Sequence, residues 1–413
     1  MALIRPFQAV RPAQGLEKEI AALPYDVYNR SEAKVVVSAN PKTFLKIDRA
    51  ETTLPDDVDT YDEMVYRQAR YLYEEMVNNG EFVKEEKPCY YLYEETMNGR
   101  AQTGLVCAAS VRDYETGVIK KHENTRADKE VDRINHVNTV DAQTGPIFLA
   151  YRNEESLNAF FERIKEETAS IFDFISDDGI RHRGFKISDD NSIRYISDSF
   201  SKIPNLYIAD GHHRCASAAR VSISRREKAL TKDDNAEYNF FLSVIFPDSE
   251  LMIMDYNRVV KDLNGLSADE FLKKVSDNFT INEIPVSDDK PAKKGDIYML
   301  LNDREYCIRL KEQFESDDPI KTLDVSKLQD YLLSPILGIN DPKTDKRIDF
   351  VGGIRGVAEL KRRLKTDSAV AFSMYPTLMS ELFAVADAGL LMPPKSTWFE
   401  PKLRSGLFIH ELS

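Results

Sequence analysis

One short segment, residues 205–219, limits what this chain can fold into more than any other part of the sequence. An apolar run from Leu206 to Ala209 has the composition and length of a buried strand. It ends at Asp210-Gly211, and a helical stretch opens directly at His212. The first N–H groups of such a helix have no partner within it, so anions bind there. The segment therefore predicts mixed strands and helices with an anion site at their junction.

The residues at this junction suit phosphate binding. Arg214 offers a guanidinium group, and His212 and His213 can donate to phosphate oxygens or accept a proton. Asp210 is placed to orient a hydroxyl group or to hold Mg²⁺, and Gly211 at the turn is counted with the phosphate-binding residues. The plainer alternative is an aspartate that caps the helix, followed by two partly exposed histidines.

A second strand–helix junction lies at Lys121–Thr125. Glu123 at this position could act as a general base toward a substrate hydroxyl. The alternative is a helix start in which Thr125, with Asp128 three residues later, resembles a capping box.

Two further segments have the composition of phosphate-binding turns. In residues 393–397, two prolines stiffen the chain, Lys395 offers a point charge, and Ser396 and Thr397 offer hydroxyl groups. The alternative is an ordered surface turn. The glycine-rich residues 352–356 could also approach a phosphate, but a tight turn is the favoured interpretation there.

Composition excludes several classes of protein. The formal net charge of −13 disfavours non-specific DNA binding. No apolar run approaches the roughly 20 residues that span a membrane. The four cysteines are far apart and six histidines are scattered apart from one adjacent pair, which predicts no metal cluster and a cytoplasmic, reducing location.

The chain of 413 residues predicts two or three domains. We expect an N-terminal α/β region in residues 1–95, which includes a helix capped by Ser31. A core follows in residues 96–246, with a hairpin near its start and a hairpin-like insertion within residues 153–203. Residues 247–413 form a C-terminal α/β region.

The junction at Asp210 resembles the signature of the ParB/sulfiredoxin-like superfamily. In that superfamily, ParB proteins contact nucleotide phosphates through a Gly-Glu-Arg-Arg type of box, and sulfiredoxins carry Gly-Cys-His-Arg. His212 stands where the sulfiredoxin cysteine would be, and Cys215 is out of register. The resemblance therefore does not extend to sulfinic-acid reduction.

The free serine kinases, which phosphorylate free L-serine, resemble the chain more closely. The similarity covers Asp-Gly-His-His-Arg, the segment from Pro394 to Thr397, and the pair His122-Glu123. It implies the role of general base for Glu123. Residues 1–95 and 153–203 have no counterpart in those kinases, and Phe399 stands where a kinase would offer a polar ring. These departures concern the substrate more than the phosphate site.

Over nearly its full length the chain is similar to a bacterial family catalogued as domain of unknown function 1015 and often labelled ParB/RepB-like. The shared pattern includes Pro24-Tyr25-Asp26-Val27, for which the residues themselves suggest no role. It also includes His122-Glu123-Asn124-Thr125, the His-His-Arg box and the segment 393–397.

Together these observations predict an α+β protein with a ParB/sulfiredoxin-like core and a segment 393–397 that folds back onto it. The resemblance implies phosphoryl transfer from ADP or ATP, with Mg²⁺ as a further candidate, to a hydroxylated metabolite, free L-serine being the first candidate. The predicted catalytic residues are Glu123, Asp210 and His212. The predicted phosphate-binding residues are Gly211, His213, Arg214, Lys395, Ser396 and Thr397. The alternatives are a ParB-like switch that binds CTP or ATP, a DNA-associated regulator, and a protein that binds a phosphometabolite without chemistry.

Overall fold

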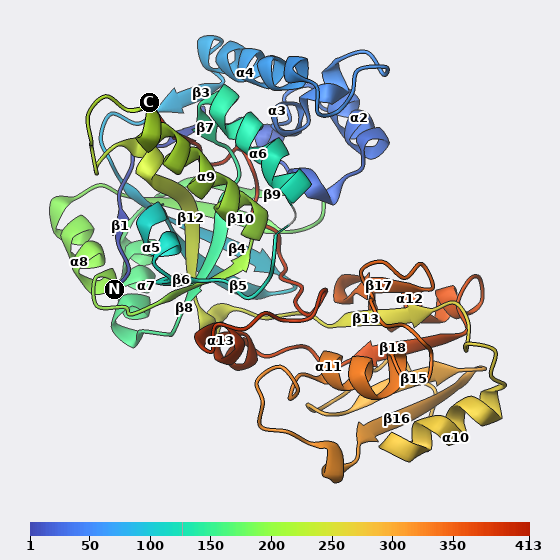
Figure 1. The fold of residues 1–413 in the computed structure, drawn as a ribbon. Coiled ribbons are helices and arrows are strands. Elements are labelled where there is room, and N and C mark those ends of the chain that lie inside the picture. The colour runs from blue at the N-terminus through green and yellow to red at the C-terminus, as the bar shows by residue number, and fades with distance from the viewer. Residues whose placement is uncertain (126) are drawn as a thin grey trace. The chain divides into compact units, whose positions relative to one another are not determined.

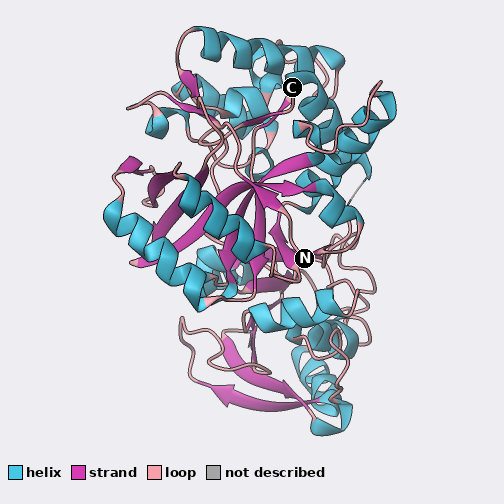
Figure 2. Ribbon diagram, turned by 90° about the vertical axis from the view of Figure 1, so that its left-hand side faces the viewer, coloured by secondary structure: helices cyan, strands magenta, loops and turns pink. Residues whose placement is uncertain are grey.

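The computed structural model describes residues 1–125 and 127–413, and the chain forms two compact units (Figure 1). Unit 1 contains Met1–Leu251 and Pro401–Ser413, and unit 2 contains Met252–Glu400. Helices lie beside strands in each unit (Figure 2), which confirms the α+β class predicted from the sequence.

A mixed sheet forms the centre of unit 1. Its strands are β1 (Ile4–Arg5), β4 (Tyr90–Met97), β5 (Arg100–Ser110), β6 (Ile119–Lys120), β8 (Ile147–Tyr151), β9 (Ser170–Ile175), β10 (Arg181–Ile187), β11 (Leu206–Asp210) and β12 (Phe240–Pro247). Within the described residues the order is β6-β11-β8-β12-β5-β4-β10-β9, and β1 pairs with β5. β11 runs parallel to β6 and antiparallel to β8. The predicted junctions after β6 and β11 therefore lie on neighbouring strands.

One face of this sheet packs against helices. Because successive strand residues point to opposite faces, alternate side chains such as Leu92, Leu149 and Ile208 share one buried cluster with helical residues. The helices that contribute to it are α5 (Val111–Glu115), α7 (Glu155–Glu167), α8 (Asp190–Phe200) and α9 (His212–Lys228).

The opposite face is covered in part by the end of the chain. The ring of Phe408 lies 5.1 Å from that of Tyr91 and 6.1 Å from that of Tyr93, measured between centroids. β19 (His410–Glu411) pairs antiparallel with β7 (Ala142–Gln143). The last residues of the chain thus belong to the core of unit 1.

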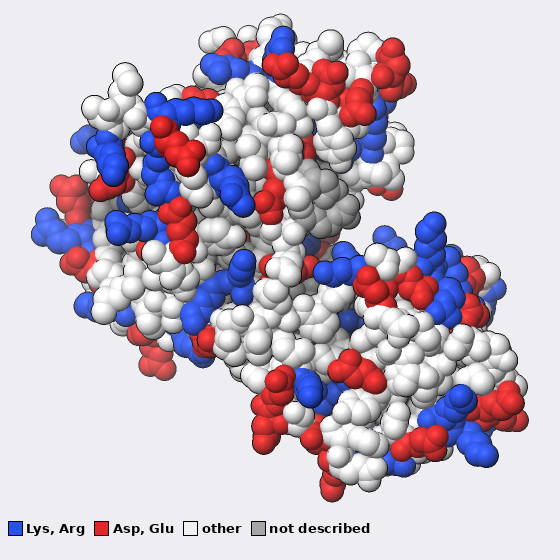
Figure 3. Space-filling view, viewed as in Figure 1, with Lys and Arg blue, Asp and Glu red and all other residues white. Residues whose placement is uncertain are grey.

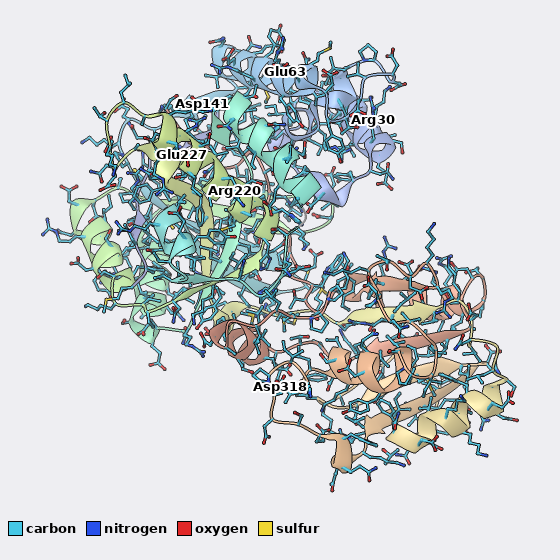
Figure 4. All side chains as sticks on the ribbon, viewed as in Figure 1. Arg30, Glu63, Asp141, Arg220, Glu227 and Asp318 are labelled. Carbon is cyan, nitrogen blue, oxygen red and sulfur yellow. The ribbon has the colours of Figure 1, made fainter. Side chains whose placement is uncertain are left out.

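The N-terminal residues of unit 1 form a second buried cluster, which includes Phe44, Leu72 and Val140. Its elements are α1 (Glu17–Ile20), α2 (Arg30–Ala39), α3 (Leu45–Asp48), α4 (Glu63–Asn78), β2 (Val10–Pro12), β3 (Phe82–Lys84) and α6 (Ala127–Val140). α6 packs against both α4 and α9. In Figure 4, Asp141 marks the end of α6, and Arg220 and Glu227 mark α9.

The predicted cap of α2 was wrong by two residues. The side chain of Asn29, not that of Ser31, accepts the N–H of Glu32, and the Glu32 carboxylate accepts the N–H of Asn29. Ser31 lies inside the first turn, where its hydroxyl group donates to the Asn29 side chain. A capping oxygen accepts an N–H two or three residues later in the chain, and Asn29 accepts that of Glu32, its third residue on.

Unit 2 is built on an antiparallel sheet with the strand order β14-β16-β15-β18-β13-β17. These strands are β13 (Tyr256–Val260), β14 (Phe279–Ile284), β15 (Ile297–Leu301), β16 (Arg304–Leu310), β17 (Ile348–Gly352) and β18 (Val370–Met374). The helices are α10 (Ala268–Asn278), α11 (Asp324–Leu328), α12 (Gly356–Leu364) and α13 (Met379–Asp387), with a π-helix at Gln329–Leu333. Leu360 of α12 packs on Val259 and Ala371 of the sheet.

The two units divide the chain differently from the three predicted regions. The predicted boundary at residue 95 falls within β4, which pairs with β5. The hairpin predicted within residues 153–203 is present as β9 and β10, but β10 also pairs with β4 and so extends the central sheet. No helix of the described residues is both long and apolar enough to cross a membrane.

Candidate functional site

The turn between β11 and α9 depends on a glycine. Gly211 precedes α9 with a φ of 90°, a left-handed conformation that glycine adopts without strain. A Cβ at this position would lie 3.0 Å from Nε of Arg214. The backbone therefore turns directly beside the guanidinium group, and the start of α9 is held next to a cation.

Asp210 stands at the centre of an ion-pair network. Its Oδ2 lies 3.2 Å from Nζ of Lys402 and 3.8 Å from Nη2 of Arg214, and its Oδ1 accepts the N–H of Gly211 at 2.9 Å. Burial alone would raise the pKa of Asp210, but the charges of Lys402 and Arg214 lower it well below its usual value. Asp210 is therefore ionised at neutral pH and is paired with two cations.

Lys402 was missed in the sequence. It lies 192 residues after Asp210, in a segment that carries no helix or strand signal. A second lysine soon after Lys395 was the one available hint, and nothing local connects it with Asp210. Only the return of the chain end to unit 1 brings the two side chains together.

The junction after β6 brings Glu123 to the start of α9. Oε2 of Glu123 lies 4.0 Å from Nδ1 of His212. The backbone N–H of His122 donates to Nε2 of His212 at 3.5 Å. A neutral imidazole has one donor and one acceptor nitrogen, so we assign the His212 proton to Nδ1. This tautomer directs an N–H group toward the Glu123 carboxylate, which is itself half exposed.

Burial keeps both histidines of this junction neutral. The rings of His122 and His212 meet edge to face, with centroids 4.5 Å apart. Burial is the main cause that lowers the pKa of His122 to about 4, although the charge of Asp210 opposes it. Burial also lowers the pKa of His212 well below its usual value, and a charge on His122 would lower it further. Glu123 therefore presents an exposed carboxylate beside the Nδ1–H group of the neutral His212.

Arg214 joins this junction to the neighbouring strand. Its Nη1 donates to the carbonyl of Pro146, and its side chain is 13% exposed. A Cβ at Gly145 would lie 3.7 Å from the same Nη1. The guanidinium group is thus fixed between the turns that contain Gly145 and Gly211. His213, the next predicted ligand, is half buried in the same helical turn.

The predicted ligands Lys395, Ser396 and Thr397 lie in unit 2. Lys395 is exposed and has a φ of 60°, a strained value for a residue other than glycine. The hydroxyl group of Ser396 donates to the Pro393 carbonyl at 2.7 Å, so its proton serves the turn itself. Their membership of one site with Arg214 stays a prediction.

A buried arginine supports the Lys395 turn within unit 2. Nη2 of Arg258 donates to the Lys395 carbonyl at 2.9 Å, and Nη1 donates to the Tyr256 carbonyl. Arg258 is 3% exposed, and no carboxylate of the described residues pairs with it. Burial lowers its pKa to about 10. The turn therefore rests on a cation for which the described residues provide no carboxylate counter-ion.

The glycine-rich segment at residues 352–356 is explained by packing. A Cβ at Gly353 would lie 2.5 Å from Oδ1 of Asp255, and one at Gly352 would lie 3.0 Å from the Trp398 ring. This close approach supports the tight-turn interpretation. The other alternative weighed on the sequence, a capping box before α6, involves Asp128, whose side chain lies outside the described residues.

A family model described as "Protein of unknown function (DUF1015)" matches residues 4–326. This chain belongs to the DUF1015 family. The match includes every predicted site residue of unit 1, but it ends before Lys395 and Lys402. No curated protein matches the sequence.

Some solved structures are similar to this DUF1015 protein. Free serine kinase in complex with AMP is 12% identical with a TM-score of 0.36, covering 74% of this chain and 91% of that chain. A mutant of free serine kinase in complex with ADP is 12% identical with a TM-score of 0.37, covering 75% and 93%. SbnI with a C-terminal truncation, from Staphylococcus aureus, is 11% identical with a TM-score of 0.36, covering 71% and 82%. With TM-scores this low, the likeness carries no argument about ligand or activity.

Proposed function

We propose that this DUF1015 protein transfers a phosphoryl group from ADP or ATP to the hydroxyl group of a small metabolite, with free L-serine as the first candidate. One observation carries the proposal. The exposed carboxylate of Glu123 comes within 4.0 Å of His212 at the helix start that also holds Arg214. This arrangement supports the proposal, because a carboxylate suited to accept a proton lies beside a helix start suited to bind an anion.

In the proposed reaction the hydroxyl oxygen of the acceptor attacks the terminal phosphorus of the nucleotide. A new P–O bond forms, and the bond between that phosphorus and the bridging oxygen breaks. Glu123 takes the hydroxyl proton, and the leaving nucleotide, ADP from ATP or AMP from ADP, keeps the electron pair. Such a transfer needs mainly positioning and charge stabilisation.

The cations near Asp210 supply that stabilisation. Arg214 and the N–H groups at the start of α9 would bind the phosphate oxygens, together with His213. His212 would hold the Glu123 carboxylate through its Nδ1–H, and Asp210 would orient Arg214 and Lys402. Lys395, Ser396 and Thr397 are proposed as further phosphate ligands.

The residues do not fit a Mg²⁺ site made by the protein alone. Asp210 is the predicted ligand, and its charge is already matched by Lys402 and Arg214. The described residues contain no group of three acidic, histidine or cysteine side chains that could hold a metal ion.

The proposal also includes two predictions made from the sequence. The first is a ParB/sulfiredoxin-like core in residues 96–246, and the second is a cytoplasmic location, which the four free cysteines favour. A DNA-associated regulator is the weaker alternative, because the formal net charge is −13 and acidic residues lie among the basic ones on the face shown in Figure 3.

A nucleotide panel tests the proposal. The unfolding temperature of the full chain is measured with CTP, ATP or ADP, each with and without L-serine. Products in parallel mixtures are followed by phosphorus NMR. Phosphoserine formed from ADP or ATP supports the kinase. Stabilisation by CTP alone supports the ParB-like switch, and stabilisation without any product supports a protein that only binds its ligand.

A further inference from the structure

The chain end that carries Lys402 is fixed to unit 1 by a buried arginine. Arg404 stands two residues after Lys402 and is 5% exposed. Two residues of extended chain span at most about 7 Å, so the place of Arg404 limits where Lys402 can lie. Arg404 therefore influences the ion pair of Lys402 with Asp210, in which Nζ and Oδ2 are 3.2 Å apart.

The partners of Arg404 lie on the hairpin of β9 and β10. Its Nη2 donates to Oδ2 of Asp178 and, at 3.3 Å, to the hydroxyl group of Ser176. Both partners belong to the turn between the two strands, where the N–H of Ser176 donates to the Ile180 carbonyl at 2.9 Å. Burial alone would raise the pKa of Asp178, but hydrogen bonds from Ser176 and Arg404 lower it below its usual value. Asp178 is therefore an ionised partner at neutral pH.

Arg404 also begins a series of buried hydrogen bonds. Its Nε donates to Nε2 of His182 at 3.4 Å. Burial and the charge of Arg404 lower the pKa of His182 to about 3, so the ring is neutral and its proton is on Nδ1. Nδ1 lies 2.7 Å from the hydroxyl group of Tyr93, which lies 3.3 Å from Oε1 of the fully buried Glu95. The guanidinium group is thus fixed on two sides.

This anchorage leaves the chain end one favourable position. An unpaired charge away from water is costly, so Arg404 cannot shift without losing its bonds to Asp178 and His182 at a large cost in free energy. The side chain of Lys402 is partly exposed, and its four-carbon stem is flexible. The rigid residue therefore restricts the backbone from which the flexible one extends.

We propose that Arg404 and Asp178 are positioning residues, which hold the chain end so that the ammonium group of Lys402 stays at Asp210 to bind a phosphate at the start of α9. The proposal rests on the phosphoryl-transfer function only for its effect on nucleotide binding, because the position of Lys402 is measurable without a ligand. It also gives a role to the hairpin within residues 153–203, for which the sequence suggested no counterpart.

Methylation of lysine amino groups tests the position of Lys402 without nucleotide. The full chain is treated with formaldehyde and a borohydride reductant, and the rate at each lysine is read by mass spectrometry. In Asp178→Asn and Arg404→Met, Lys402 should react at least about three times faster, because the carboxylate no longer stabilises its charged, unreactive form. Lys84, which pairs with Glu411 later in the same chain end, should react at the parental rate.

A second ion pair on the same hairpin provides the matched control. Asp173→Asn removes the exposed partner of Arg181, on the strands and not at the turn, and should leave Lys402 methylation unchanged. Asp178→Glu keeps the charge and should restore most of the parental protection. If Arg404→Met fails to fold, Asp178→Asn, at the partly exposed turn, still provides the test. Unchanged methylation of Lys402 in every folded variant overturns the proposal.

A double-mutant cycle shows whether the effect on the nucleotide passes through Lys402. Calorimetry should show ADP binding weakened about fivefold in Asp178→Asn and in Lys402→Met. The double variant should bind ADP no more weakly than Lys402→Met, because both changes act on one interaction. Additive losses would mean that Asp178 acts by another route, and they would overturn the positioning role.

The two proposals fail in different ways. If Lys402 reacts faster in the hairpin variants but the parent binds no nucleotide, the positioning role stands and the kinase fails. If phosphoserine forms while the variants leave Lys402 methylation unchanged, the kinase stands and the positioning role fails.

Discussion

The start of α9 in unit 1 and the Lys395 turn in unit 2 both present cations, but the two are stabilised in different ways. In unit 1, Arg214 and Lys402 share the carboxylate of Asp210. In unit 2, Arg258 is buried against backbone carbonyls, and no carboxylate of the described residues pairs with it. Within the part of the chain that the structure describes, a carboxylate balances the first group of cations and none balances Arg258.

This difference shows how each group can respond to an anion. Cations held by a carboxylate are fixed in position, but part of their charge is already neutralised before a phosphate arrives. A buried cation without a counter-ion is costly, and a bound anion relieves that cost. We therefore expect the α9 start to control geometry and catalysis, and the Lys395 turn to contribute affinity.

The largest expected effect comes from Glu123→Gln. The amide cannot accept the hydroxyl proton, so kcat should fall at least about 100-fold, the lower range for loss of a general base. The affinity for nucleotide should stay unchanged, because Arg214 and the helix start remain. Rapid-quench kinetics and nucleotide titration measure the two quantities. Full turnover by this variant would remove Glu123 from the mechanism and leave the α9 start as a binding site.

Acid should destabilise unit 1 through protonation of the buried His122. Arg258, the buried cation of unit 2, does not take part in this effect. The pKa of His122 is about 4 in the fold and about 6.5 when unfolded, so the unfolded chain binds the proton first. The free energy of unfolding should therefore fall as the pH drops from about 6.5 to about 4, by up to about 3 kcal/mol for this residue. Urea unfolding at several pH values measures the slope. His122→Gln should make the slope shallower, while His136 and His212, whose pKa values are also lowered by burial, keep part of it. An unaltered slope would show that His122 does not contribute.

Asp210→Asn converts the first group of cations into one like the second. Arg214 and Lys402 lose their counter-ion, so binding of inorganic phosphate should tighten several-fold while turnover falls. The depressed pKa of Asp210 contributes stability above about pH 4, the unfolded value, and this contribution is lost as the pH falls further. The variant should lack that acid-dependent part. Weaker phosphate binding in Asp210→Asn would mean that the carboxylate positions the cations more than it neutralises them.

The smallest expected effect concerns Lys395→Gly. Glycine adopts a φ of 60° without strain, so the variant should gain up to about 1 kcal/mol of stability. Loss of the ammonium group should weaken nucleotide binding a few-fold. Lys395→Ala is the matched control, since it removes the charge and keeps the strain. If both variants bind nucleotide as the parent does, the Lys395 turn is not part of the site.

The sequence by itself determined the local elements and the α9 start. Apolar runs and glycine turns predicted β11 and the start of α9 close to their observed positions, because these patterns reflect hydrogen bonding between near neighbours in the chain. Glu123 and His212 were also predicted, since both stand where a strand passes into a helix.

The tertiary structure alone decided which charges meet. Lys402 reaches Asp210 across 192 residues, and Arg133 reaches Tyr25 across more than a hundred. No periodic pattern records such pairs, because they depend on how α6, α9 and the returning chain end pack around the sheet of unit 1. The sequence predicted where an anion could bind, and only packing determined which cations would be paired with a carboxylate.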